Sequence, residues 1–128
     1  DKVAAIGFCF GGTVALELAR SGAPVPAVVS FHGGLATQEA ASKDTLKSKV
    51  LVLHGADDPN VPAKDVDAFQ EEMRAAGADW QLVAFGGAVH SFTDPDAHFK
   101  GSAEYHPVVA KRAYAMMDDF LTETLGAP

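Results

Sequence analysis

The sequence predicts an α/β protein with a mostly parallel sheet of about four strands and helices on both faces. Three observations lead to this prediction. Short apolar runs alternate along the chain with segments of helical character. The clearest run, residues 49–55, is continuously apolar over its centre, as in a parallel strand covered on both faces. The segments between the apolar runs are long enough for the crossovers that parallel strands require.

The first half of the chain contains two predicted strands and one predicted helix. Residues 3–6 form a short apolar run that ends at Gly7 and is typical of a buried strand. Residues 11–20 have helix-compatible side chains with an apolar face, and glycine and proline follow them. Residues 27–31 form the second apolar run. Residues 32–34 are expected to form a loop, and residues 35–48 are polar and small without a sustained period, so we expect a loop with a short turn there.

The second half adds two further strands and two helices. After the strand at 49–55, Pro62 suits the first turn of a helix whose apolar residues recur at helical spacing up to Gly77. Residues 80–85 form the fourth strand. A loop of about twenty residues, rich in Gly, Asp, Pro and His, precedes the last helix, which is predicted over 106–125.

Bulk properties limit the classes of function. At 128 residues, the chain 1–128 is expected to form a single domain. A net charge of -7 disfavours nucleic acid and anionic membranes as partners, because both select basic surfaces. No apolar stretch approaches the ~20 residues that cross a bilayer. A lone cysteine fits a reducing compartment, so we expect a cytoplasmic protein. The start at an aspartate, directly before a strand, indicates a fragment or processed chain.

The segment Gly7-Phe8-Cys9-Phe10-Gly11 carries the strongest chemical signal. It follows a strand, opens a helix and matches the glycine-x-nucleophile-x-glycine pattern of a nucleophile elbow, with cysteine in place of serine. The pattern implies a sharp turn whose flanking positions lack bulk. The N-terminus of the following helix favours a thiolate, and the Phe10 N–H would donate to an oxyanion. The alternative is a buried cysteine that acts as a small hydrophobe. Dinucleotide and phosphate-loop patterns are not matched.

Two partners for Cys9 follow in the chain order of α/β-hydrolases. Asp58 lies in the loop after the third strand, and His90 lies in the loop after the fourth. Parallel strands bring these loops to one edge of the sheet. The alternatives are that Asp57 is the acid, and that His90 is a loop histidine bonded to nearby backbone. Five histidines without ligand spacing predict no metal site, and no cofactor is implied.

The chain resembles the dienelactone hydrolase family over nearly its whole length. The resemblance rests on Gly-Phe-Cys-Phe-Gly-Gly at the elbow, on His-Gly-x-x-Asp around Asp58 followed by Val-Pro, and on Val-His-Ser-Phe at His90. The residues 105–125 are similar to the closing helix of that family. The resemblance implies an ester or lactone hydrolase with a Cys9, Asp58 and His90 triad and an acyl-enzyme intermediate.

The resemblance also bears on the substrate. The best-known members carry an arginine a few residues after the catalytic histidine, where this sequence has Asp94. A small, uncharged ester or lactone is therefore at least as good a candidate as dienelactone. Phe10, His32 and Phe92 are candidates to line the substrate pocket. Phe8 and Trp80 are expected in the core.

In this family the elbow follows the fifth of eight strands, whereas here it lies at the start of the sequence. The resemblance therefore implies that an N-terminal half is absent, together with a second oxyanion donor and an acid that controls the resting cysteine. The first strand would then be an exposed apolar edge, and we expect a homodimer through residues 3–6 or a segment that completes the sheet. A catalytically silent binding or regulatory module is the alternative function, and a redox-sensing cysteine ranks below it because no resolving cysteine is present.

Overall fold

The computed structural model describes residues 2–128. Its elements follow the predicted order, with one short hairpin added in the loop before the last helix. The elements are β1 (Ala4–Phe8), α1 (Phe10–Arg20), β2 (Ala27–Phe31), β3 (Lys49–Gly55), α2 (Ala63–Ala75), β4 (Trp80–Phe85), β5 (His98–Phe99), β6 (Ala103–Glu104) and α3 (Pro107–Leu125).

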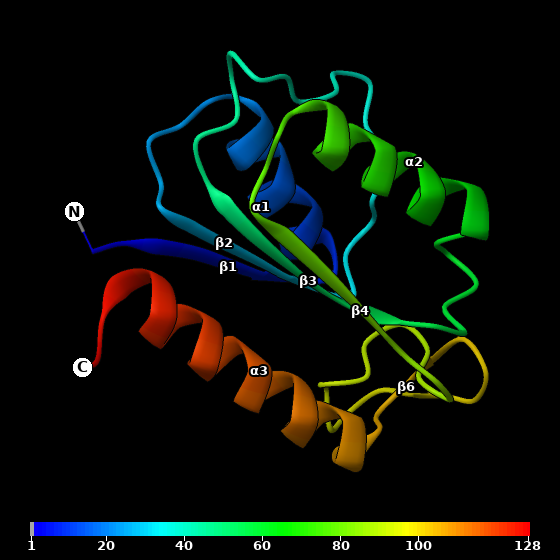
Figure 1. The fold of residues 1–128 in the computed structure, drawn as a ribbon. Helices are drawn as coiled ribbons and strands as arrows, with labels where there is room; N and C mark the ends of the chain where they lie inside the picture. Colours follow the sequence, from blue (N-terminus) through cyan, green and yellow to red (C-terminus); the bar gives the residue numbers. More distant parts are fainter. Residues whose placement is uncertain (1) are drawn as a thin grey trace.

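The four long strands form one parallel sheet in the order β1-β2-β3-β4. Helices α1 and α2 cover one face of this sheet, and α3 covers the other (Figure 1). Because successive side chains of a strand point to opposite faces, a strand covered on both sides must be apolar throughout. In β3, Val50 and Val52 pack toward α1 and α2, whereas Leu51 and Leu53 pack toward α3. The predicted fold class is confirmed.

Strand β1 lies at one edge of the sheet and is paired only with β2 within the described residues. Its burial is incomplete, in contrast to β2, whose five residues are all buried. Val3, Ile6 and Phe8 are 57 %, 42 % and 41 % exposed. The predicted apolar edge is therefore present in the structure.

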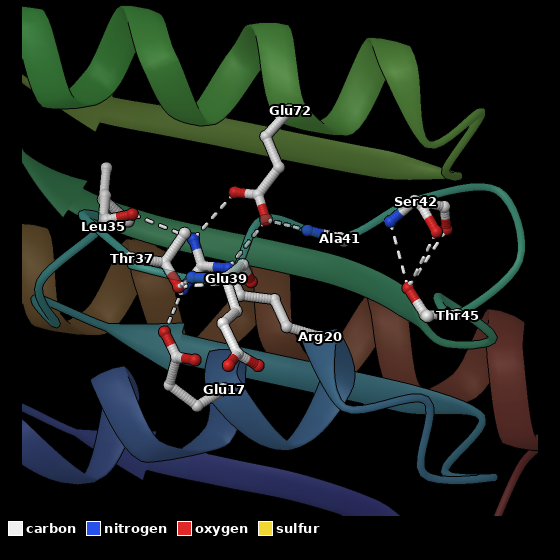
Figure 2. Close-up of polar contacts among 9 residues, drawn as sticks. All are labelled: Glu17, Arg20, Leu35, Thr37, Glu39, Ala41, Ser42, Thr45 and Glu72. Carbon is white, nitrogen blue, oxygen red and sulfur yellow. Dashed lines mark hydrogen bonds and ion pairs between the residues drawn. The ribbon is translucent and has the colours of Figure 1, made fainter.

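A buried ion pair fastens the loop between β2 and β3 to both helices of one face (Figure 2). Arg20 at the end of α1 donates from Nε and Nη2 to the two carboxylate oxygens of Glu72 in α2, each at 2.8 Å. The same guanidinium donates to the carbonyl of Leu35 at 2.9 Å. Glu72 in turn accepts the backbone N–H of Ala41 at 2.7 Å. The loop thus has a fixed path although it contains no helix or strand.

The loop that precedes α3 is more ordered than its composition predicts. His98–Phe99 and Ala103–Glu104 pair as a short antiparallel hairpin. Two-residue strands are too short to carry a periodic pattern, so they could not be predicted from the sequence. Within residues 2–128, no helix is both long enough and apolar enough to cross a membrane.

Candidate active site

Cys9 occupies the single residue between β1 and α1. Its backbone has φ 55° and ψ -121°, a conformation that L-residues rarely adopt. Neighbouring hydrogen bonds hold it there: its N–H donates to the Phe31 carbonyl at 3.0 Å, and its carbonyl accepts from Gly12 N at 3.0 Å and Thr13 N at 3.2 Å. The side chain of Cys9 makes no capping hydrogen bond to α1. The turn presents the sulfur at the carboxyl end of the sheet.

The two glycines flanking the nucleophile are not equivalent. A Cβ on Gly7 would lie 1.9 Å from the carbonyl oxygen of Gly11, so the turn can form only without a side chain at position 7. A Cβ on Gly11 would meet no atom of the described chain within 4 Å. The predicted need for a small residue therefore holds at Gly7, whereas within residues 2–128 Gly11 has room for a side chain.

Asp58 and His90 form a hydrogen-bonded pair between two neighbouring loops. The Asp58 Oδ2 atom lies 2.9 Å from His90 Nδ1, and the carboxylate side chain is fully buried. Its other oxygen accepts the Asn60 N–H at 2.9 Å. Asp57 instead points elsewhere and accepts the Gly87 N–H at 3.1 Å. Of the two adjacent acids, Asp58 is the one that orients the imidazole and leaves Nε2 as the nitrogen for other partners.

The small hairpin supports the position of His90. The His90 N–H donates to the Ser102 carbonyl at 3.2 Å, and the His90 carbonyl accepts the Glu104 N–H at 3.0 Å. His106, which caps α3, uses its own N–H to bond the Phe92 carbonyl at 2.9 Å. The segment carrying the histidine is thus held on one side by Ser102 and Glu104, which were predicted to lie in a loop, and on the other by His106, the predicted first residue of the last helix.

The sulfur of Cys9 contacts two other side chains. His32 Nδ1 lies 3.2 Å from Sγ, and Ser91 Oγ lies 3.1 Å from it. Within residues 2–128, no hydrogen bond joins the sulfur to His90. The rings of His32 and His90 are nevertheless neighbours, with centroids 5.6 Å apart. The three predicted residues therefore share one edge of the sheet, with His32 beside both the thiol and His90.

His32 is enclosed, and its environment keeps it uncharged. The residue is 1 % exposed and packs edge-on against the Phe92 ring at a centroid distance of 4.9 Å. Burial lowers the pKa of His32 to about 4, and the neighbouring His90 acts in the same direction. Nε2 lies 2.9 Å from the Thr93 hydroxyl. His54, one strand away, has its pKa lowered by burial as well.

The aromatic candidates separate into exposed and buried groups. Phe10 is 78 % exposed and remains available to a ligand, and its N–H, as the first of α1, has no partner within the helix. Phe92 and His32 are buried, so neither offers surface to a substrate in this arrangement. Phe8, expected in the core, is 41 % exposed and stacks on Phe31 at 4.6 Å. Trp80 is partly buried and packs edge-on against Phe69, as expected for a core position.

Sequence reasoning missed Ser91 and Thr93. Ser91 has a positive φ of 58°, a conformation usual for glycine. A serine in the sequence does not predict such a conformation. The position of Ser91 directly after His90 was the one feature of the sequence that could have identified it as a site residue. No group of three or more His, Cys, Asp or Glu side chains that could hold a metal ion occurs among residues 2–128.

Comparisons with known proteins agree on one family. The model of the dienelactone hydrolase family matches residues 1–125. A Caenorhabditis elegans protein that is named as uncharacterized is 38 % identical over 127 residues, which cover 96 % of this chain and 80 % of that protein.

Two solved structures resemble the fold closely. The one named m3DLH has a TM-score of 0.85 and 46 % identity, covering 95 % of this chain and 52 % of its own. A dienelactone hydrolase-like promiscuous phosphotriesterase from metagenomic libraries has a TM-score of 0.88 and 45 % identity, and the match covers 97 % of this chain and 53 % of that protein. The chain also spans about half the length of curated relatives whose names include carboxymethylenebutenolidase.

Proposed function

Because this chain belongs to the dienelactone hydrolase family, we propose that it supplies the Cys9, His90 and Asp58 side chains that hydrolyse a carboxylic ester or lactone. One observation carries the proposal. The buried Asp58 carboxylate bonds His90 Nδ1 at 2.9 Å, at the edge of the sheet where the strained turn presents the sulfur. An acid-oriented imidazole beside a nucleophile is the arrangement that acyl transfer requires.

The reaction proceeds in two balanced halves. His90 takes the thiol proton, and the sulfur of Cys9 attacks the carbonyl carbon, whose π electrons move to oxygen. The tetrahedral oxyanion, stabilised by the Phe10 N–H, collapses and expels the alkoxide, which receives the proton from His90. Water then gives a proton to His90 and attacks the thioester. Collapse of this second oxyanion releases the acid and the sulfur, which regains its proton from His90.

His90, and not His32, is the proposed base, although His32 lies closer to the sulfur. A general base works best when its pKa is near the working pH, and burial lowers the pKa of His32 to about 4. His32 also lacks a carboxylate on its second nitrogen, which faces Thr93. His90, by contrast, has the Asp58 carboxylate hydrogen-bonded to its Nδ1. The proposed mechanism therefore requires the sulfur to leave its contact with His32 and turn toward His90, whose ring centroid lies 5.6 Å from that of His32.

The charge of the site favours an uncharged substrate. Asp94, four residues after His90, lies close enough to His32 to act on its ionisation, and it occupies the segment where a cation would be needed to bind a carboxylate. We therefore expect neutral aryl esters and lactones to be hydrolysed with higher kcat/KM than esters that carry a second carboxylate.

The test uses the full-length protein with a neutral aryl ester. Cys9→Ala is expected to lower kcat by at least about 10³-fold, because the covalent route is lost. Asp58→Asn is expected to lower it by about 10²- to 10⁴-fold through the wrong imidazole tautomer. Asp57→Asn is the matched control, since it keeps an acceptor for Gly87 and leaves Asp58 in place. Mass spectrometry after a rapid quench should find an acyl group on Cys9.

Two results would contradict the proposal. Equal hydrolysis by the wild type and Cys9→Ala removes the cysteine mechanism. A wild-type protein inactive on a broad set of esters and lactones favours the catalytically silent module instead.

A further inference from the structure

The three residues that meet at the sulfur share an unusual backbone. Among residues 2–128, the non-glycine residues with positive φ are Cys9, His32 and Ser91, at 55°, 41° and 58°. Such conformations are unfavourable and persist only where surrounding contacts hold them, often at functional sites. Here the contacts converge, since Nδ1 of His32 and Oγ of Ser91 lie 3.2 Å and 3.1 Å from the same sulfur. The three unfavourable backbone conformations therefore belong to Cys9 and to the two residues, His32 and Ser91, whose side chains contact its sulfur.

The hydrogen bonds of His32 determine which ring nitrogen carries the proton. The Cys9 N–H donates to the Phe31 carbonyl at 3.0 Å and shares a second contact with Nδ1 of His32 at 3.2 Å, and this second contact favours a neutral ring without a hydrogen on Nδ1. The proton of the neutral ring is then on Nε2, which donates to the Thr93 hydroxyl at 2.9 Å. The sulfur of Cys9 consequently faces a lone pair of His32. A thiol can donate to that lone pair, whereas a thiolate is repelled by it.

On the basis of the proposed cysteine mechanism, we propose that His32 is a positioning residue that holds the resting Cys9 as a protonated thiol. The S–H donates to Nδ1 of His32, and the Ser91 hydroxyl donates to the sulfur, which completes a chain of hydrogen bonds ending at Thr93. His32 is 1 % exposed and its ring packs edge-on against Phe92, and this packing restricts its rotation. This contact opposes the N-terminus of α1, which by itself favours the thiolate.

The charged and titratable groups around His32 keep its ring neutral near pH 7. Burial, followed by the neighbouring His90, lowers the pKa of His32 to about 4 against the opposing effects of Asp58 and Asp94. Because the burial effect is the largest, the lone pair on Nδ1 persists across the pH range in which a thiol ordinarily ionises.

The test is the alkylation rate of Cys9 by iodoacetamide in the full chain, read by mass spectrometry on the tryptic peptide 3–20. His32→Asn keeps an acceptor near the Nδ1 position, whereas His32→Gln moves its polar group toward Thr93. At pH 7 we expect His32→Gln to react about fivefold faster than wild type, the effect of one lost hydrogen bond to the thiol. His32→Asn should stay within about twofold.

A second pH separates ionisation from access. At about pH 10, where thiols are ionised, all three proteins should react at the same rate. An equal rate of wild type and His32→Gln at pH 7, or the same ratio at both pH values, overturns the proposal. So does ¹⁵N NMR of the wild type if it finds the proton of His32 on Nδ1.

Neither readout requires turnover, so the two proposals can fail separately. Loss of ester hydrolysis in Cys9→Ala, combined with no effect of His32→Gln on alkylation, rejects the positioning role alone. Unchanged hydrolysis in Cys9→Ala rejects the cysteine mechanism, while alkylation and the ring tautomer still decide whether His32 holds the thiol.

Discussion

At Cys9 the protein maintains a conformation that costs about 1–3 kcal/mol, and the hydrogen bonds of the turn offset this cost. The strained turn determines the direction in which the Cys9 sulfur points. A relaxed strand or helix would bury the sulfur or direct it along the sheet, whereas the sharp turn sets it beside His32 and Ser91. The position of the sulfur therefore depends on backbone geometry that only glycine at position 7 permits.

The two glycines around the nucleophile provide a matched pair of substitutions. Gly7→Ala places a methyl group 1.9 Å from the Gly11 carbonyl, so we expect the free energy of unfolding to fall by about 3 kcal/mol or more. Gly11→Ala has open space in α1 and should change it by less than about 1 kcal/mol. Urea unfolding followed by circular dichroism measures both. A Gly7→Ala variant as stable as Gly11→Ala would show that the turn is not constrained as described.

At the scale of elements, the ion pair of Arg20 and Glu72 joins α1 and α2 across the loop between β2 and β3 (Figure 2). Its side chains are 3 % and 6 % exposed. Arg20 is also paired with Glu17 at 2.8 Å and donates to the Leu35 carbonyl, and Glu72 also accepts the Ala41 N–H. That same loop begins at His32. The pair thus holds the loop at Leu35 and Ala41, three and nine residues after the proposed positioning residue.

Removal of one buried partner should be costly. Arg20→Met leaves the Glu72 carboxylate buried without its cation, and we expect a loss of about 3 kcal/mol in the free energy of unfolding. Arg74→Met is the matched control, because its pair with Glu71 is exposed and should contribute less than about 1 kcal/mol. Denaturant unfolding of the full chain provides both values. Similar losses for the two variants would contradict a dominant buried pair.

At the scale of the whole molecule, the sheet formed by residues 2–128 is covered on both faces, and β1 is its edge strand with exposed apolar side chains. An exposed edge strand tends to pair with another strand through its free N–H and C=O groups. We propose that a second copy of this chain pairs with β1, with a further segment that completes the sheet as the alternative. A net charge of -7 opposes this association, so the apolar side chains of Val3, Ile6 and Phe8 must provide most of its free energy.

A single lysine on that edge tests the association. Ile6→Lys should shift the protein toward monomer in sedimentation velocity, because a charged side chain on an exposed edge strand disfavours its pairing with another strand. Val108→Lys, on an exposed position of α3, is the control and should leave the distribution unchanged. A wild type that remains monomeric at all concentrations, or an Ile6→Lys protein that still dimerises, would contradict the edge-pairing proposal.

Most of the fold was predictable because its signals are local. The apolar run at 49–55 and the helical spacing before Gly77 identify elements whose bounds differ little from the structure. The β5 and β6 hairpin was not predictable, since its two-residue strands depend on contacts with the His90 backbone and not on their own side chains. Phe8 was misplaced because the open edge of β1 leaves its stacked ring half exposed.

The sequence by itself determined the family resemblance, the parallel α/β architecture and the pairing of Asp58 with His90, because motif spacing and strand order bring those two loops together. Only the tertiary structure decided what surrounds the sulfur. His32 and Ser91 lie 23 and 82 positions from Cys9, and their reach depends on positive φ angles that no sequence pattern encodes. Periodicity reports burial along one element, whereas the direction of a side chain beyond a strand end follows from the packing of several loops at once.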